Sequence, residues 1–307
     1  MLNSPQTEKN PWVSLLIIVL LSFGTALVSP LLFSYLVSLA VGADYSDVTS
    51  AFSQPDLFPH LKGALLTVQF LTSLSAFVLV PLYFIWQYED RMFQLYFRFD
   101  NINPVAALTT SLLVLAFMVV NSVFIEWNMN IEFPESIATI AREMEDRGKV
   151  LTDYFTDFDT IPYFLFSIIV IAIVPAIGEE LLFRGVIQRQ VLRISGNVHV
   201  AVWLAAIFFS TFHFQFFGFV PRMLLGALFG YLFVYSGNLV YSIIAHFVNN
   251  GFTLLMIYLH QNDMVSYDIE NTETVPLESV GIFAIIGAVL FVYFYKQMNP
   301  VGNPANE

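Results

Sequence analysis

Long apolar runs separated by short polar segments extend along almost the whole chain. A helix that crosses a bilayer needs about 20 predominantly apolar residues, and these runs approach or exceed that length. Pro30 in the first run and Pro81 in the second are the predicted bend points. The pattern predicts an all-α polytopic membrane protein of about eight transmembrane helices, over residues 12–41, 62–87, 104–125, 160–182, 198–216, 219–236, 238–259 and 277–295.

The basic residues of the connecting segments fall on one side of this predicted bundle. An even number of spans puts both termini on that side, and the positive-inside rule makes it cytoplasmic. We therefore expect an integral membrane protein with cytoplasmic N- and C-termini. The compact chain, in which no organelle retention signal is seen, favours a bacterial plasma (inner) membrane. The basic residues concerned are Lys9, Arg91, Arg98, Arg189, Arg193 and Lys296.

The connection 126–159 falls on the opposite side and is too long for a simple turn. Within it, residues 134–148 carry Ile137, Ile140 and Met144 at helical spacing. This spacing predicts a short helix that lies on the outer interface of the membrane.

Composition narrows the classes of function. The chain is 57% hydrophobic and 12% charged, and its formal net charge is −12. Such an acidic chain is not expected to bind nucleic acid, so the expected partners are the lipid bilayer and a substrate. The chain has no cysteine, which excludes disulfides, zinc–thiolate sites and a thiol nucleophile.

Polar side chains at membrane depth are the candidates for function, because burying an ionisable group in a bilayer is costly. Arg222, at the outer start of its run, is expected to extend to the interface instead. Asn249 is expected to make a hydrogen bond between helices. The candidate residues are Glu179, Glu180, Arg184, His213, His246 and Asn250.

Simple helical geometry brings these candidates to one depth. Glu180 and His213 are almost equally far from the turn 194–197, about 25 Å at 1.5 Å per residue, so an antiparallel hairpin makes them neighbours. His246 lies about 13 Å from its own turn, also on the cytoplasmic side. The spacing permits one buried cluster within the cytoplasmic half of the bilayer.

The residue types in that cluster suit hydrolysis of an amide by an activated water molecule. One carboxylate can accept a proton from water while Arg184 holds the other in its ionised form. A histidine and an asparagine amide can donate hydrogen bonds to an oxyanion. Catalysis by a serine is poorly supported, because Ser210 lies one turn from His213 without a Gly-x-Ser-x-Gly elbow.

Three segments together resemble the CAAX prenyl protease and bacteriocin-processing (CPBP) family of intramembrane proteases, which includes the type II CAAX prenyl endopeptidases. The family pattern is Glu-Glu-x-x-x-Arg, then Phe-x-x-x-His, then His-x-x-x-Asn. Here these segments read EELLFR at 179–184, FSTFH at 209–213 and HFVNN at 246–250. The resemblance covers about residues 160–260.

The resemblance implies a role for each motif residue. Glu179 would be the general base that activates the water, with His213 assisting. His246 and Asn250 would stabilise the oxyanion, whereas Glu180 and Arg184 would support the structure and charge of the site.

The resemblance also suggests how the chain is divided. Residues 1–125 form an N-terminal three-helix transmembrane region, and 126–159 form the outer loop with its interfacial helix. Residues 160–260 are the CPBP-type protease core, and 261–307 hold an outer loop, the last transmembrane helix and a short tail.

Metal dependence and substrate stay open at this point. A glutamic-type protease without a cofactor is favoured, because there is no His-Glu-x-x-His pair. Zinc is the alternative, with Glu179, His213 and His246 as candidate ligands. The expected substrate is a peptide or a membrane protein, with a prenylated tail as the eukaryotic family role.

Two other classes of function remain as alternatives. A proton-coupled transporter also uses intramembrane Glu and His residues, but the remaining spans carry few polar residues to line a path. A non-catalytic immunity or scaffold protein of the same fold would tolerate the loss of a motif residue, and none is lost. Glu180 and Arg184 have a structural alternative of their own, which is a buried ion pair.

Overall fold

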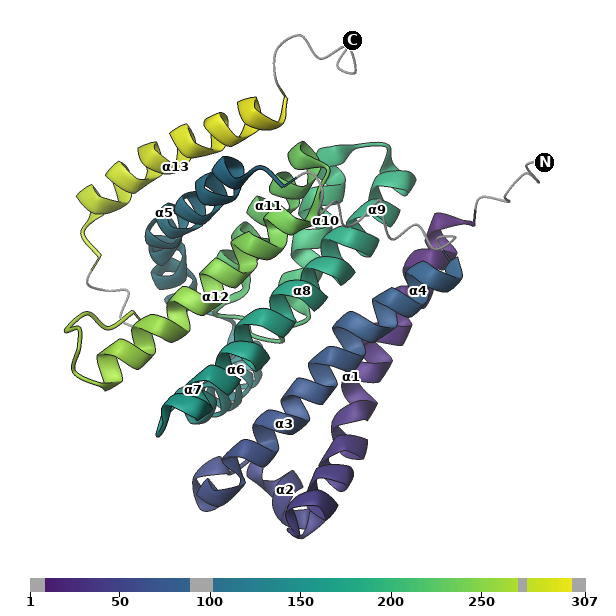
Figure 1. Ribbon diagram of the computed structural model, residues 1–307, viewed down its shortest axis with the longest axis vertical. Helices are drawn as coiled ribbons and strands as arrows, with labels where there is room; N and C mark the ends of the chain where they lie inside the picture. The colour runs from purple at the N-terminus through teal and green to yellow at the C-terminus, as the bar shows by residue number, and fades with distance from the viewer. Residues whose placement is uncertain (1–8, 89–101, 270–274, 300–307) are drawn as a thin grey trace.

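The computed structural model describes residues 9–88, 102–269 and 275–299, and every regular element in those ranges is a helix (Figure 1). Three π-helical segments join α-helices into longer continuous helices. These are η3 (Leu74–Leu79), η6 (Ile168–Ile173) and η7 (Leu181–Ile187). The α-helices are α1 (Pro11–Val41), α2 (Tyr45–Ala51), α3 (Lys62–Ser73), α4 (Val80–Tyr88), α5 (Pro104–Met129), α6 (Glu135–Thr156), α7 (Ile161–Ser167), α8 (Val174–Glu180), α9 (Gln188–Ser195), α10 (Val198–Thr211), α11 (Phe219–Ser236), α12 (Leu239–Gln261) and α13 (Leu277–Met298).

The predicted class, an all-α polytopic membrane protein, is confirmed. Within the described ranges, 7 helices are long and apolar enough to cross a membrane. Two of them are composite, over Pro59–Tyr88 and Ile161–Ser195. The eighth predicted span is shorter than expected, because α10 has only 14 residues. The chain turns after Thr211 instead of continuing to 216, with Phe214 at a positive φ of 53°.

Prolines act differently in the different spans. Pro30 lies inside α1, which continues without a break in its assignment. Pro81 and Pro175 each follow a π-helical segment, in which the backbone bonds from i to i−5. Proline lacks the N–H that an α-helix needs, and a π turn is one way to accommodate that loss.

Several helix ends meet at one end of the bundle, where α1 begins and α13 ends (Figure 1). Lys9 donates to the carbonyl of Gln87 at 2.7 Å and accepts, at its own carbonyl, from Arg193 at 2.9 Å. On the other side of the bundle, the Tyr241 hydroxyl accepts from the backbone N–H of Asn103. The basic residues Arg91 and Arg98 lie outside the described residues. We call the end of the molecule where α1 begins and α13 ends the Lys9 end.

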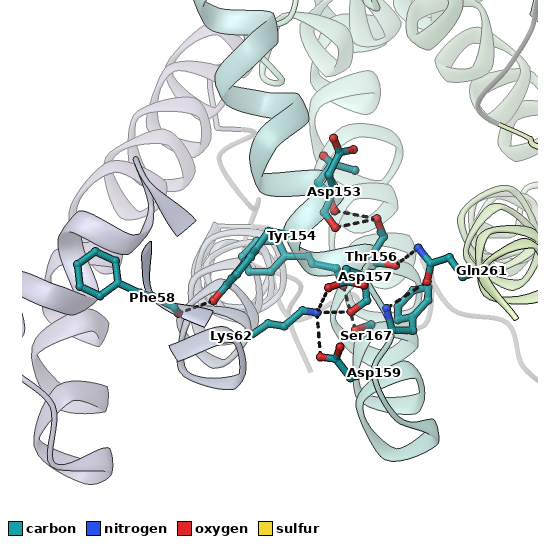
Figure 2. A network of polar contacts seen from close by, with 12 residues as sticks. Phe58, Lys62, Asp153, Tyr154, Thr156, Asp157, Asp159, Ser167 and Gln261 are labelled. Carbon is teal, nitrogen blue, oxygen red and sulfur yellow. Dashed lines mark hydrogen bonds and ion pairs between the residues drawn. The ribbon is translucent and has the colours of Figure 1, made fainter. Parts of the chain in front are cut away.

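Helix α6 lies at the opposite end and extends eight residues beyond the predicted 134–148 segment. Its C-terminal end is tied to three other parts of the chain (Figure 2). Tyr154 donates to the Phe58 carbonyl at 2.8 Å, and Gln261 of α12 donates to the Thr156 carbonyl at 2.9 Å. Lys62 of α3 binds the carboxylates of Asp157 and Asp159 and the carbonyl of Asp157. We call this the α6 end.

The glycines of α11 allow unusually close packing in the middle of the bundle. A Cβ added at Gly226 would lie 3.2 Å from Ala206 of α10 and 3.2 Å from the Arg184 guanidinium. At Gly230 it would lie 2.8 Å from the Gln188 side chain. The backbone of α11 can therefore approach the polar face of the 161–195 helix directly, which positions the site.

Candidate active site

Glu180, Arg184 and His246 form a fully buried polar cluster. Glu180 Oε1 accepts from Arg184 Nη1 at 2.6 Å and from His246 Nδ1 at 2.8 Å. The side chains of Glu180 and Arg184 are both 0% exposed. Because Arg184 lies four residues after Glu180, the two share a helix face, and the buried ion pair considered above is present.

The same helix face is fixed to the backbone of α11. Arg184 Nη2 donates to the Gly226 carbonyl at 2.9 Å, and Gln188 Nε2 donates to the Gly230 carbonyl at 3.3 Å. Phe209 and Phe229 cover the guanidinium, with ring centroids 4.6 and 5.3 Å from Cζ. Gln188 was not predicted from the sequence. Gln188 follows Arg184 by four residues, and Gly230 follows Gly226 by four, so the matching spacing could have indicated that the two pairs face each other.

Glu179 has a different environment from its neighbour, because successive residues of a helix point about 100° apart. Its side chain is 13% exposed and lines a cavity of about 620 Å³. His246 Nε2 faces it, 3.9 Å from Glu179 Oε2. Other residues in the cavity wall are Phe209, His213, Arg222, Asn249 and Asn250.

His213 lies in the turn after α10, and one ring nitrogen is already engaged. Its Nδ1 lies 2.9 Å from the carbonyl oxygen of Phe209. A carbonyl can only accept, so Nδ1 carries the proton and the Nε2 of the neutral ring is left as an acceptor. The ring is thus prepared to receive a hydrogen bond in the cavity rather than to donate one.

Asn250 is held in place by two hydrogen bonds. Its Nδ2 donates to the Ile171 carbonyl at 3.0 Å, and its Oδ1 accepts from Asn249 at 3.0 Å. In a regular α-helix the Ile171 carbonyl would accept from residue 175, and Pro175 has no N–H to donate. Asn250 therefore satisfies a carbonyl of the π-helical segment and keeps one amide hydrogen for other partners.

The structure alters two geometric expectations for the glutamates. Glu179, not Glu180, lines the cavity with His213, while Glu180 binds His246. The cavity also extends toward α6 rather than toward the Lys9 end, since Gly148, Leu151 and Thr152 of α6 line it. Thr152 is exposed, so the cavity reaches the surface beside α6.

The expectation that Arg222 extends to the interface is wrong. Its guanidinium lines the cavity and donates from Nη2 to Gln215 Oε1 at 2.7 Å. Gln215 in turn donates to Glu145 of α6 at 3.3 Å. The turn that ends α10 places Gln215 beside Arg222. The pKa of Glu145 is raised above its ordinary value, because the effect of burial is larger than the opposing effect of the positive charge of Arg222.

The donor set does not match a zinc site. Zinc needs three or four protein ligands that converge within about 2 Å of one point. Among the residues that the structure describes, no three His, Cys, Asp or Glu side chains are grouped so that they could hold a metal ion. Glu179, His213 and His246, the candidate ligands, line one cavity without forming such a group.

A protein-family model matches the segment of the chain that carries this site. Residues 161–252 match the family model described as "Type II CAAX prenyl endopeptidase Rce1-like". These residues contain all seven specified positions of the three motifs and lie inside the expected 160–260 core. Residues 161–252 are thus similar to the type II CAAX prenyl endopeptidases, in a chain whose described residues include 7 candidate membrane spans.

One curated relative is similar to part of the chain. The chain is 30% identical over 93 residues to "Uncharacterized protein YpbD" of Bacillus subtilis (strain 168). The match covers 29% of this chain and 42% of that protein, so it spans about two fifths of the relative's length. No solved structure matches the chain.

Proposed function

We propose that the chain is an intramembrane endopeptidase that hydrolyses a peptide bond with a water molecule activated by Glu179. The observation that carries this proposal is the asymmetry of the two glutamates. Glu180 is already neutralised by Arg184, whereas Glu179 lines a cavity that it shares with two histidines. The family match over residues 161–252 supports the same class of activity.

The reaction begins when Glu179 accepts a proton from water and the water oxygen attacks the carbonyl carbon of the substrate. His213 Nε2 accepts a hydrogen bond from the second O–H of that water, which orients it. The carbonyl oxygen becomes an oxyanion as the C–O bond forms. The C–N bond then breaks, the proton held by Glu179 passes to the departing nitrogen, and a carboxylic acid and an amine are released.

Hydrogen-bond donors for the oxyanion come from α12. His246 donates from Nε2 when its ring carries two protons, and Asn250 has one amide hydrogen left.

The substrate in this proposal is a peptide or the tail of a membrane protein, with or without a prenyl group. The wall of the cavity includes apolar side chains such as Ile125, Leu151 and Leu225, which suit an aliphatic segment. The resemblance to a Bacillus subtilis protein supports the expectation of a bacterial plasma membrane.

The test is proteolysis by the full-length protein in liposomes. The probe is a fluorescent peptide that ends in Cys-Val-Leu-Ser, with and without a prenyl group on the cysteine. We expect wild-type protein to cleave it, Glu179→Gln to lose at least about 100-fold in kcat, in line with general-base catalysis, and a strong chelator to have no effect.

Each other outcome has a separate meaning. Loss of cleavage in chelator would replace the glutamic mechanism by a metal-dependent one. Full activity of Glu179→Gln would remove Glu179 from the role of base. Absence of cleavage of either peptide by wild-type protein would contradict this substrate class.

A further inference from the structure

Arg222 is a buried cation whose hydrogen-bonding capacity is only partly used. Its Nη1 is buried without a hydrogen-bond partner in the part of the chain that the structure describes. Its Nη2 is held by the neutral side chain of Gln215 at 2.7 Å. The charges of Glu145 and Glu179 act on this guanidinium, but its Nη1 still lacks an acceptor, so it can bind a further anionic group that enters the cavity.

The same cavity contains an unsatisfied hydrogen-bond acceptor. Asn121 Nδ2 donates to the carbonyl of Pro221, the residue before Arg222, at 3.2 Å. Its Oδ1 is buried and likewise has no partner among the described residues. Both side chains line the cavity that contains Glu179. One cavity therefore offers a cationic donor and a neutral acceptor.

The C-terminal residue of a peptide presents the complementary pair of groups. Its carboxylate accepts hydrogen bonds from a guanidinium, and its backbone N–H donates to an amide oxygen. An internal stretch of polypeptide has no carboxylate at its backbone and would leave Arg222 unpaired. Arg222 and Asn121 would thus distinguish the C-terminal residue of a substrate from an internal residue.

The location suits a residue that binds the far end of the product segment. Arg222 lies four residues before Gly226, whose carbonyl binds Arg184 at the level of the two glutamates. Four helical residues span about 6 Å, which is on the order of two extended peptide residues, before the length of the arginine side chain is added. A short C-terminal segment fits between the activated water and Arg222.

We propose that Arg222 is a specificity-determining residue that binds the free C-terminal carboxylate of the substrate, with Asn121 accepting from the terminal backbone N–H. This inference rests on the proposed proteolysis and narrows its substrates to chain ends. Gln215 keeps the guanidinium in place without neutralising it, and Glu145 is the one carboxylate on α6 linked to it through Gln215.

The deciding experiment measures binding rather than turnover. The probe is the unmodified Cys-Val-Leu-Ser peptide with either a free carboxylate or a carboxamide at its C-terminus. Its affinity is measured by fluorescence anisotropy for the full-length Glu179→Gln protein, which does not consume it. We expect the carboxylate form to bind about 10- to 100-fold more tightly, the ratio typical of a charge-assisted hydrogen bond.

Variants of the arginine separate recognition from folding. Arg222→Met in the same background is expected to reduce the affinity for the carboxylate form to that for the carboxamide. Arg222→Lys is expected to retain part of the preference, because it keeps the charge. Arg142→Met removes an exposed arginine of α6 and is the matched control, with no change in the preference.

Equal affinity of the two peptides for the Glu179→Gln protein, including no binding of either, would overturn the proposal. So would an equal loss for both peptides in Arg222→Met, which is the result of a purely structural role. A preference for the carboxylate without cleavage by wild-type protein would leave this inference standing and contradict the proposed function instead.

Discussion

The adjacent residues Glu179 and Glu180 have different surroundings, and this difference gives Glu179 a proposed role in catalysis and Glu180 a role in stability. Glu180 is 0% exposed and its Oε1 is bound by both Arg184 and His246, whereas Glu179 is 13% exposed and faces the cavity. An equal substitution at the two positions should therefore change different properties of the protein.

We predict that Glu180→Gln lowers the free energy of unfolding by about 3–5 kcal/mol, because it leaves the buried charge of Arg184 uncompensated. Glu179→Gln should cost less stability than Glu180→Gln, because Glu179 lies 3.9 Å from His246, beyond hydrogen-bond distance, and faces the cavity, while it lowers kcat by at least about 100-fold. Unfolding in detergent, followed by tryptophan fluorescence, measures both values. A larger loss of stability in Glu179→Gln than in Glu180→Gln would contradict this assignment.

The hydrogen bond from Asn250 to the Ile171 carbonyl depends on Pro175, which has no N–H to donate to that carbonyl. Asn250→Ala should cost about 1–3 kcal/mol, because the buried carbonyl is left without a donor. Pro175→Ala restores a backbone N–H four residues after Ile171, so the same Asn250→Ala change should cost less in that background. A double-mutant cycle measures the coupling, and strictly additive effects would show that the two residues do not serve one carbonyl.

The sequence predicted how deep in the membrane each site residue lies, but not which way its side chain points around the helix axis. The motif spacing places Glu179, Glu180, His213 and His246 at similar heights, and they do lie around one site. Which glutamate meets which histidine depends on rotation about the helix axis. The π-helical segments η6 and η7 flank the glutamates, and each widened turn shifts the following residues around the axis. No hydrophobic pattern reports such a turn.

At the scale of single elements, α10 shows why counting apolar residues overestimates a helix. The run 198–216 is apolar throughout, yet the helix ends at Thr211. Ser210 donates to the Phe219 carbonyl at 2.6 Å, which folds the chain back onto the start of α11. This early end is what brings His213 to the cavity wall and Gln215 into contact with Arg222.

Helix α6 depends on Lys62, whose side chain is 10% exposed while those of Asp157 and Asp159 are 70% and 66% exposed. We predict that Lys62→Met loosens the C-terminal end of α6, because one buried ammonium serves two carboxylates and a backbone carbonyl (Figure 2). Asp159→Asn removes only one exposed ion pair and should cost less than about 1 kcal/mol.

Hydrogen exchange measured by mass spectrometry distinguishes these variants. Lys62→Met should increase exchange in residues 149–157 by at least tenfold, while the core of α12 stays protected. Asp159→Asn is the matched control and should resemble wild type. Unchanged protection of α6 in Lys62→Met would show that Tyr154 and Gln261 are sufficient to hold it.

On the scale of the whole molecule, the end of the bundle that is predicted to be cytoplasmic is not the end at which the cavity opens. The Lys9 end carries the basic residues that predict a cytoplasmic location. The cavity reaches the surface at the other end, beside α6. If both statements hold, a substrate tail enters from the non-cytoplasmic side, which favours exported or membrane-anchored peptides over prenylated cytoplasmic proteins.

Orientation can be measured directly, since the chain has no cysteine of its own. Ser53 and Ser195 are exposed, the first close to Phe58 at the α6 end and the second close to Arg193 at the Lys9 end. We predict that a membrane-impermeant maleimide labels Ser53→Cys in intact cells and labels Ser195→Cys only after the cells are permeabilised. The reverse pattern would place the cavity mouth in the cytoplasm, and the prenylated tail of a cytoplasmic protein would then become the favoured substrate.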